Sequence, residues 1–250
     1  MAAEVSQFEA FLQRWMDRQK EHLEELLAVQ KHFHEMQEDV IRHLINRVLT
    51  HYGQYFEEKS KIAQQDIILV YSPPWFTTME KGFYWLGGFK PGMAFDVVAT
   101  SVPDFTETQK ERLNHLKQVT KVKERGLNDD LAKLHESTGA PPLMEKIRSH
   151  GRLCINRSPN AADGLVPSSY KEKLEKMVQS ADALRTNTAL KIVHILTLPQ
   201  IVAFLAGVAQ FHIKVRSNGL EKDAHDKAAA PPAAPPAAPP AAPPAAPPAA

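Results

Sequence analysis

The chain has 250 residues, with 30 basic and 29 acidic side chains and a formal net charge of +1 at pH 7. This balance does not resemble the strongly basic face of a domain that binds nucleic acid mainly through phosphates, although it leaves a local basic patch open. The single cysteine, Cys154, excludes an internal disulfide framework and a cysteine-based zinc cluster, and it favours a reducing compartment.

The last twenty residues, 231–250, are five repeats of PPAA. Proline has no amide donor and a fixed φ, so we expect an extended, disordered tail. We predict one helical domain at residues 1–220, with an internal loop at 149–169, and a disordered Pro/Ala-rich tail at 221–250. The start has no basic segment before an apolar run, and the chain has no run of eighteen apolar residues, so we expect neither a signal peptide nor a membrane span.

The first half of the chain has the apolar spacing of helices. Residues 5–63 predict two long amphipathic helices with a break near 30–35. After the Ser72-Pro73-Pro74 break we expect a short helix at 77–86, ended by GGFKPG, because paired glycines before a proline stop a helix. Another short helix is predicted at 93–101.

The second half begins with a capping box, in which Thr106 and Gln109 satisfy each other's free amides. The helix that it opens is predicted to run to about Arg125, with an interruption at Gly126 and a new helix near residue 129. Two more helices are predicted from residue 170 to 195 and after Thr197, the last stopped by SNG at 217–219. No strand pattern of any length occurs, so the predicted fold is all-α.

The stretch FYWLGGFKPG, residues 83–92, differs from the helical sequence around it. It is not a phosphate loop, because neither the GxxxxGK[ST] spacing nor a preceding strand is present. Glycines beside Phe83, Trp85 and Phe89 predict a corner where backbones approach closely while the rings fill the core. We interpret Lys90 as solvated, with anion binding as the alternative.

No arrangement of residues predicts catalysis or a metal site. GxSxG and HExxH are absent, and Cys154 with His150 lies in the predicted loop, so we expect no enzyme. Most of the eleven histidines, among them His22, His43 and His51, are interpreted as surface residues. His212 lies on an apolar helix face, where a core histidine is favoured over a cofactor ligand. The basic run at 117–125 is interpreted as a solvated helix face, with a phosphate-facing patch as the alternative.

Four blocks of the sequence resemble the plant Delay-of-Germination (seed dormancy control) domain family, whose domain also forms the C-terminal part of TGA bZIP transcription factors. The blocks are FEAFLQRWMDRQKEHLEELL, HYGQYFEEKSKIAQQD, SPPWFTTMEKGFYWLGGFKP and LEKMVQSADALRTNTALKIVHILTLPQIVAFLAG, within residues 5–217. The family signature falls on Trp15, Phe83, Trp85, Gly87, Gly88, Phe89, Pro91, Asp182, Leu184 and Arg185.

The resemblance implies a non-enzymatic regulatory protein-interaction domain in the nucleus or cytoplasm of a plant. It implies a role in a pathway such as the abscisic acid response, seed dormancy or pollen aperture patterning. The implied partners are type 2C phosphatases, transcriptional co-regulators or bZIP factors. The long amphipathic N-terminal helices leave open whether they pack within the chain or against a second copy of it, as a homodimer. The alternative is a transcription regulator with sequence-specific DNA binding, direct or through a bZIP partner, although these residues contain no bZIP segment.

The resemblance also makes His212 a candidate haem ligand, since haem binding through histidines near the last helix is associated with the dormancy branch of the family. Arg216 stands where the second histidine is expected, which leaves the ligand pair incomplete.

Overall fold

The computed structural model describes residues 2–137, 147 and 166–229, and nearly all of them are helical, which confirms the all-α prediction. The elements in chain order are α1 (Ala2–Lys31), η1 (Phe33–Glu35), α2 (Glu38–Gln65), α3 (Ile67–Tyr71), α4 (Thr78–Gly82), β1 (Tyr84–Trp85), β2 (Gly88–Phe89), α5 (Met93–Ser101), α6 (Glu107–Glu136), α9 (Ser168–Ile195) and α10 (Leu198–Ala229). The predicted break between the two N-terminal helices is the short helix η1.

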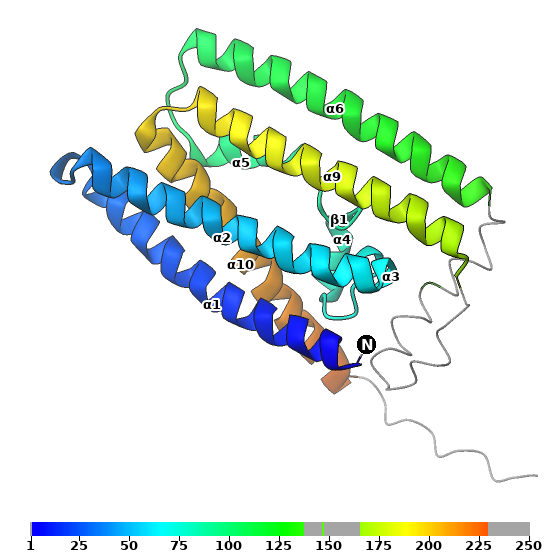
Figure 1. Ribbon diagram of the computed structural model, residues 1–250. Coiled ribbons are helices and arrows are strands. Elements are labelled where there is room, and N and C mark those ends of the chain that lie inside the picture. The colour runs from blue at the N-terminus through cyan, green and yellow to red at the C-terminus, as the bar shows by residue number, and fades with distance from the viewer. Residues whose placement is uncertain (1, 138–146, 148–165, 230–250) are drawn as a thin grey trace, which may run out of the picture.

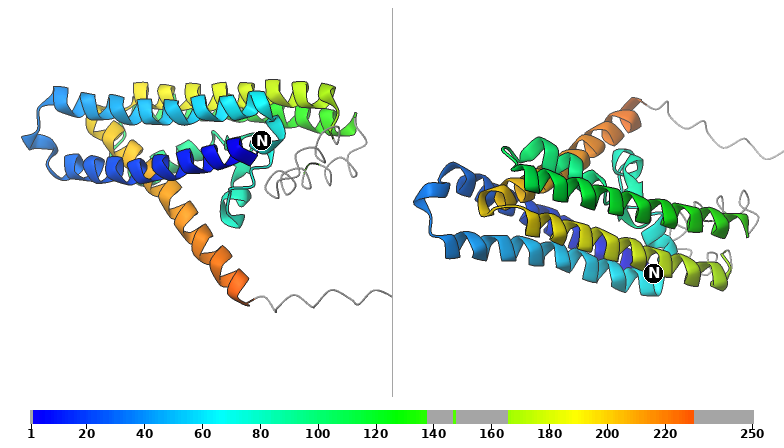
Figure 2. Two further views of the ribbon diagram at one scale, coloured as in Figure 1. Left: turned by 60° about the horizontal axis from the view of Figure 1, so that its bottom comes forward. Right: turned by 90° about the horizontal axis from the view of Figure 1, so that it is seen from above.

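Four long helices lie beside one another in the order α6, α9, α2 and α1, and α10 crosses α2 and α1 diagonally (Figure 1). The N-terminal part of α10 packs on α5, and the helix also contacts α1, α2 and α4. Figure 2 shows the C-terminal part of α10 leaving the bundle at a steep angle. Helix α10, from the end of the chain, therefore packs on elements of its first half.

Two large apolar clusters and a smaller third one fill the bundle in the described part of the chain. One lies around α3 and the adjoining part of α9 and includes Ile68, Val70, Tyr170 and Leu174. The other lies around the α1–α2 turn, α5 and the start of α10, and includes Leu26 and Phe204. Burying side chains of this size stabilises the fold by roughly 1.5 to 3 kcal/mol each, before entropy costs.

The starts of α6 and α10 are joined by their capping residues. The predicted capping box is confirmed, with Thr106 Oγ1 accepting from the Gln109 amide and Gln109 Oε1 accepting from the Thr106 amide. Gln200 Oε1 likewise accepts from the Thr197 amide at 3.0 Å. The two glutamines bond to each other, Gln109 Nε2 to Gln200 Oε1, at 2.7 Å. One buried amide pair thus satisfies helix ends that are far apart in sequence.

Two predicted helix ends are wrong. Helix α6 continues through Gly126 to Glu136, because a lone exposed glycine costs only about 1 kcal/mol and the packing of α6 on α9 outweighs it. Helix α10 continues through Gly219 to Ala229, so the domain boundary placed at residue 220 falls inside this helix. The predicted loop at 149–169 and the PPAA tail lie largely outside the described residues.

By length and composition, α10 is the one helix in the described part of the chain that qualifies as a membrane span. Its residues 202–206 are buried in the cluster that includes Leu26 and Phe204. A buried core helix passes the same test, and this burial accounts for the apolar composition of α10.

Candidate functional site

The glycine-rich stretch forms a small antiparallel hairpin. Tyr84 pairs with Phe89 and Trp85 with Gly88, which leaves Leu86 and Gly87 as a two-residue turn. Both turn residues have positive φ, 41° for Leu86 and 82° for Gly87, as a type I′ turn requires. The predicted helix at 77–86 is therefore wrong at its C-terminal end, since α4 ends at Gly82. Strands of two residues are too short to show alternation in the sequence.

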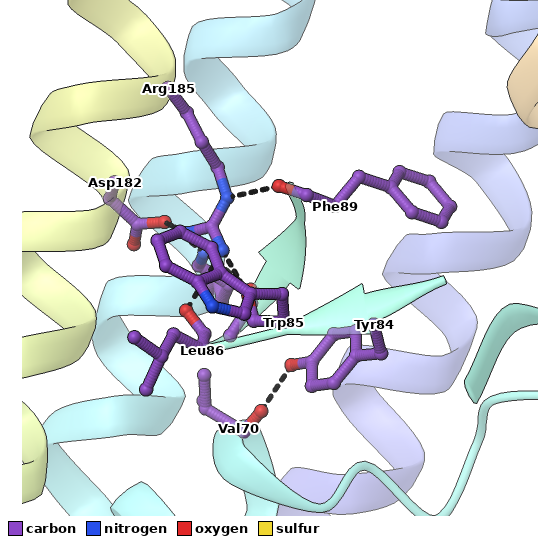
Figure 3. A network of polar contacts seen from close by, with 9 residues as sticks. Val70, Tyr84, Trp85, Leu86, Phe89, Asp182 and Arg185 are labelled. Carbon is purple, nitrogen blue, oxygen red and sulfur yellow. Dashed lines mark hydrogen bonds and ion pairs between the residues drawn. The ribbon is translucent and has the colours of Figure 1, made fainter. Parts of the chain in front are cut away.

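Arg185 of α9 holds this hairpin through its backbone carbonyls (Figure 3). Its Nε donates to the Phe89 carbonyl at 2.7 Å, and its Nη2 donates to the Leu86 carbonyl at 2.9 Å and to that of Trp85. The guanidinium also lies 5.4 Å from the centre of the Trp85 ring. A planar guanidinium with several donors suits this task, and a lysine would not replace it.

Asp182 neutralises two buried cations beneath the hairpin. Its Oδ1 accepts from Arg185 Nη1 and from Lys59 Nζ of α2, each at 2.6 Å. Lys59 is 3% exposed and also donates to the Gly87 carbonyl at 2.8 Å. Burial lowers the pKa of Lys59 to about 8, although the carboxylate of Asp182 favours the charged form. The hairpin, α2 and α9 are thus joined in one network.

Gly87 of the turn and Gly88 of strand β2 are both needed for close approach. A Cβ on Gly88 would lie 2.9 Å from Arg185 Nε, and one on Gly87 would lie 2.9 Å from Val178 Cγ1. Gly87 also has a φ of 82°, which an L side chain rarely adopts. The GG pair therefore lets Arg185 and Val178 of α9 reach the turn.

The aromatic rings of this stretch fill the core only in part, with Trp85 packed against the cluster around α3. Phe83 is 40% exposed, and Trp85 is half-buried with its Nε1 donating to Asn128 Oδ1 of α6 at 2.7 Å. Phe89 packs against Phe211 and His212 of α10. The buried side chain of the turn is Leu86, which is 3% exposed.

A second polar network fixes the entry to the hairpin. Glu80 caps α4 together with Thr77, and both of its carboxylate oxygens lie 3.0 Å from Arg216 Nη1 of α10. On the other side, Glu124 of α6 accepts from the Gly92 amide at 2.6 Å and lies 3.7 Å from Lys90 Nζ. Lys90 is exposed, as interpreted from the sequence, but has this acidic neighbour.

Sequence reasoning missed most of these charged residues. Lys59, Glu124 and Arg216 sit among other charged helix residues and show no pattern that marks them as partly or fully buried. Glu80 did leave a signal, because Thr77 followed three residues later by a glutamate is a capping box.

The remaining signature residues, Trp15, Leu184 and Pro91, are buried and therefore have structural roles. Trp15 is 6% exposed and donates from Nε1 to the His51 carbonyl at 2.9 Å. Leu184 is 7% exposed, and Pro91 is buried beside the hairpin strand. Leu184 is a chain neighbour of Asp182 and Arg185 on α9, whereas Trp15 lies in a separate cluster with Leu12 and Met16.

Two histidines interpreted as surface residues are buried. His51 is 2% exposed and stacks on Trp15 with ring centres 4.4 Å apart, and His22, 7% exposed, meets its edge at 5.0 Å. Burial lowers the pKa of His51 to about 3, and that of His22 is also lowered. The interpretation failed because Trp15 and His22 lie on α1 and His51 lies on α2, so their contact depends on how the two helices pair. His43 is exposed, as interpreted.

His212 does not offer a site that fits haem. Its ring stacks on Phe89 at 5.1 Å and has Tyr52 and Trp15 at 5.8 and 6.5 Å, so aromatic rings cover it on several sides. Arg216, in the place of a second ligand, is held by Glu80. Burial lowers the pKa of His212 to about 4. Among the described residues, no group of three or more His, Cys, Asp and Glu side chains is placed to bind a metal ion.

Taken together, the fold and the site define an all-α domain in which a hairpin is clamped between helices from both halves of the chain. A family model for seed dormancy control, DOG1, matches residues 21–100. The chain is 34% identical over 218 residues to Protein ZW2 of Arabidopsis thaliana, covering 85% of this chain and 96% of that protein. It therefore belongs to the seed dormancy control family, as the sequence motifs predicted.

Two further relatives differ in the share of their own length that matches this chain. The chain is 29% identical to Protein RESPONSE TO ABA AND SALT 1 of Arabidopsis thaliana, over 86% of this chain and 96% of that protein. It is 26% identical to transcription factor TGA3 of Arabidopsis thaliana, over 87% of this chain but 54% of that protein. The chain thus spans about half of this TGA factor.

Proposed function

We propose that the protein is a non-enzymatic regulatory adaptor that binds other proteins in a plant signalling or developmental pathway. The observation that carries this proposal is the clamp on the hairpin. Asp182, Arg185 and Lys59 direct their charged atoms at one another and at backbone carbonyls, which stabilises a scaffold and leaves none of these groups aimed at a substrate. A rigid scaffold whose outer helix faces are exposed suits an adaptor.

The names of the relatives support a role in a plant signalling or developmental pathway. One similar protein is named for its response to ABA and salt, and others are named as transcription factors. The proposed partners are type 2C phosphatases, transcriptional co-regulators or bZIP factors, in the nucleus or the cytoplasm. Abscisic acid response, seed dormancy and pollen aperture patterning are the proposed settings.

The test is affinity capture of the tagged full chain from plant extract, with and without nuclease, followed by mass spectrometry. A tagged PPAA peptide, residues 231–250, serves as the control bait, since it removes partners that bind the proline-rich tail alone. We expect partners that are specific to the full chain and that survive nuclease. Full-chain capture that returns nothing beyond the control bait would overturn the proposal.

The alternative function is a transcription regulator that acts on DNA directly or through a bZIP partner. The similarity to TGA factors supports it, although the matched region is about half of TGA3. Partners that disappear on nuclease treatment, together with a salt-sensitive shift of labelled DNA, would favour this alternative.

A further inference from the structure

Helix α6 lies at the edge of the bundle. Figure 1 shows it at the end of the row of long helices, beside α9, and the right-hand view of Figure 2 shows it from above with its length uncovered by other described elements. Its buried side chains, such as Leu113, Leu116 and Thr120, fall on one side of the helix. The other sides of α6 face solvent.

One exposed side of α6 carries a ladder of cations. Lys117, Lys121 and Arg125 are all exposed and lie four residues apart, so they project from the same side of the helix. Lys90 reaches this side from the hairpin, because its Nζ lies 3.7 Å from Glu124. We call Lys90, Lys117, Lys121 and Arg125 the α6 basic face.

The carboxylates near this face in the described part of the chain are Asp96, Glu124 and Asp129, and they are outnumbered by its four cations. Lys117 lies 3.9 Å from Asp96, a contact between side chains that are 51% and 77% exposed and therefore screened by solvent. Glu124 is shared between the Gly92 amide and Lys90. No ion pair joins Lys121 or Arg125 to another residue that the structure describes.

The arrangement works against the stability of the helix itself. Like charges four residues apart repel, and the ladder contains two such pairs, Lys117 with Lys121 and Lys121 with Arg125. Val122 adds an apolar side chain that is 66% exposed and lies three residues from Arg125 on the helix surface. Neither feature contributes to packing on α9.

We infer that the α6 basic face is a docking surface for an acidic helical segment of a partner protein. Three cations four residues apart on a helix lie about 6 Å apart along its axis, which matches carboxylates at the same spacing on a second helix. Val122 would contact an apolar residue of that segment. This inference rests on the proposed adaptor function and names the chemistry of one partner.

A protein partner fits better than nucleic acid. The whole chain has a net charge of +1, whereas domains that bind nucleic acid through phosphates are strongly basic. The half-buried Trp85, whose Nε1 bonds to Asn128 of α6, lies over Arg185 and is not free to stack on a base. Charge complementarity therefore points to carboxylates.

The test compares the full chain with two triple variants by fluorescence anisotropy. The probe is a labelled helical peptide of about 20 residues with a glutamate at every fourth position beside leucines. The ladder variant carries Lys117→Glu, Lys121→Glu and Arg125→Glu. The control carries Lys31→Glu, Lys191→Glu and Lys222→Glu, which change the net charge equally at exposed positions on α1, α9 and α10. Circular dichroism melts show whether both variants remain folded, and a Gln version of the ladder variant serves if the Glu version does not.

We expect the ladder variant to bind the probe at least about tenfold more weakly, the control to bind like wild type, and wild-type binding to weaken as salt rises from about 50 to 300 mM. Equal losses in both triple variants, or no binding by wild type, would overturn the inference. Preferential binding of a labelled DNA duplex that the ladder variant loses would also overturn it. Full-chain capture that still returns nuclease-resistant partners would leave the adaptor proposal standing in each of these cases.

Discussion

Lys59 and Asp182 are 123 residues apart in the sequence, yet Lys59 Nζ lies 2.6 Å from Asp182 Oδ1 beneath the hairpin turn. This contact joins α2 to α9, and Arg185 shares the same carboxylate oxygen. Removing one member of a buried charge group costs more than the contact itself is worth, because the remaining charges are left without a partner.

The variant Asp182→Asn should therefore lower the free energy of unfolding by about 3 kcal/mol. Urea denaturation followed by circular dichroism measures the loss. The matched control is Asp130→Asn, because Asp130 forms an exposed pair with Lys133 at 3.5 Å and should contribute less than about 1 kcal/mol. Similar losses in both variants would mean that the buried network does not stabilise the fold.

Glycine positions should differ in sign when changed to alanine. Gly88→Ala places a Cβ against Arg185 and should destabilise the protein by about 1 to 3 kcal/mol, because the guanidinium would have to move away from the hairpin carbonyls. Gly126→Ala has open space around it inside α6 and should stabilise by up to about 1 kcal/mol. Melting temperatures of the two variants provide the comparison, and a rise for Gly88→Ala would contradict the close approach of α9.

Acid should destabilise the fold through its buried histidines. The pKa of His51 is lowered to about 3 in the folded state, so an unfolded chain takes up a proton on this residue once the pH falls below about 6.5. Stability from this group is present above pH 6.5 and is lost toward pH 3, with a slope of about 1.4 kcal/mol per pH unit. His212, with a pKa of about 4, adds a slope of the same sign.

The variant His51→Leu should reduce this slope by about one proton between pH 6 and 4.5, as measured by urea denaturation at several pH values. His43→Leu is the control, because His43 lies on the same helix and is exposed. An unchanged slope in the His51 variant would show that this ring is protonated as easily in the folded protein as in the unfolded chain.

Haem should not bind through His212. The ring is covered by Phe89 and neighbouring aromatic side chains, and Arg216 is held by Glu80. Titration with hemin should therefore give no Soret band that depends on His212. A band present in wild type and absent in His212→Ala would contradict this expectation.

The sequence predicted those elements whose signals are local. The break between α1 and α2, the bounds of α5 and the Thr106–Gln109 capping box all depend on neighbouring residues, and each was found. The helix end predicted at Gly219 was wrong because glycine occurs both at helix ends and where two elements pack closely. Here it does not end a helix but lets α10 approach α4, where a Cβ would lie 2.2 Å from Thr77 Oγ1.

For the candidate site, the sequence identified residues that belong to it but did not indicate how they contact one another. The motifs named Trp85, Gly88 and Arg185, but no local pattern indicates that Arg185 donates to carbonyls about 100 residues earlier in the chain. The burial of His51 against Trp15 was missed for the same reason, since it depends on the pairing of two helices.

The clamp on the hairpin limits how the protein can be shortened. Residues 21–100, which match the family model, contain the hairpin and Lys59 but not Asp182 or Arg185. A fragment cut to that range would leave a buried ammonium without its carboxylate and three hairpin carbonyls without their donor. The recognisable motif is therefore not a separable module, and a truncation study needs α9 to retain a folded hairpin.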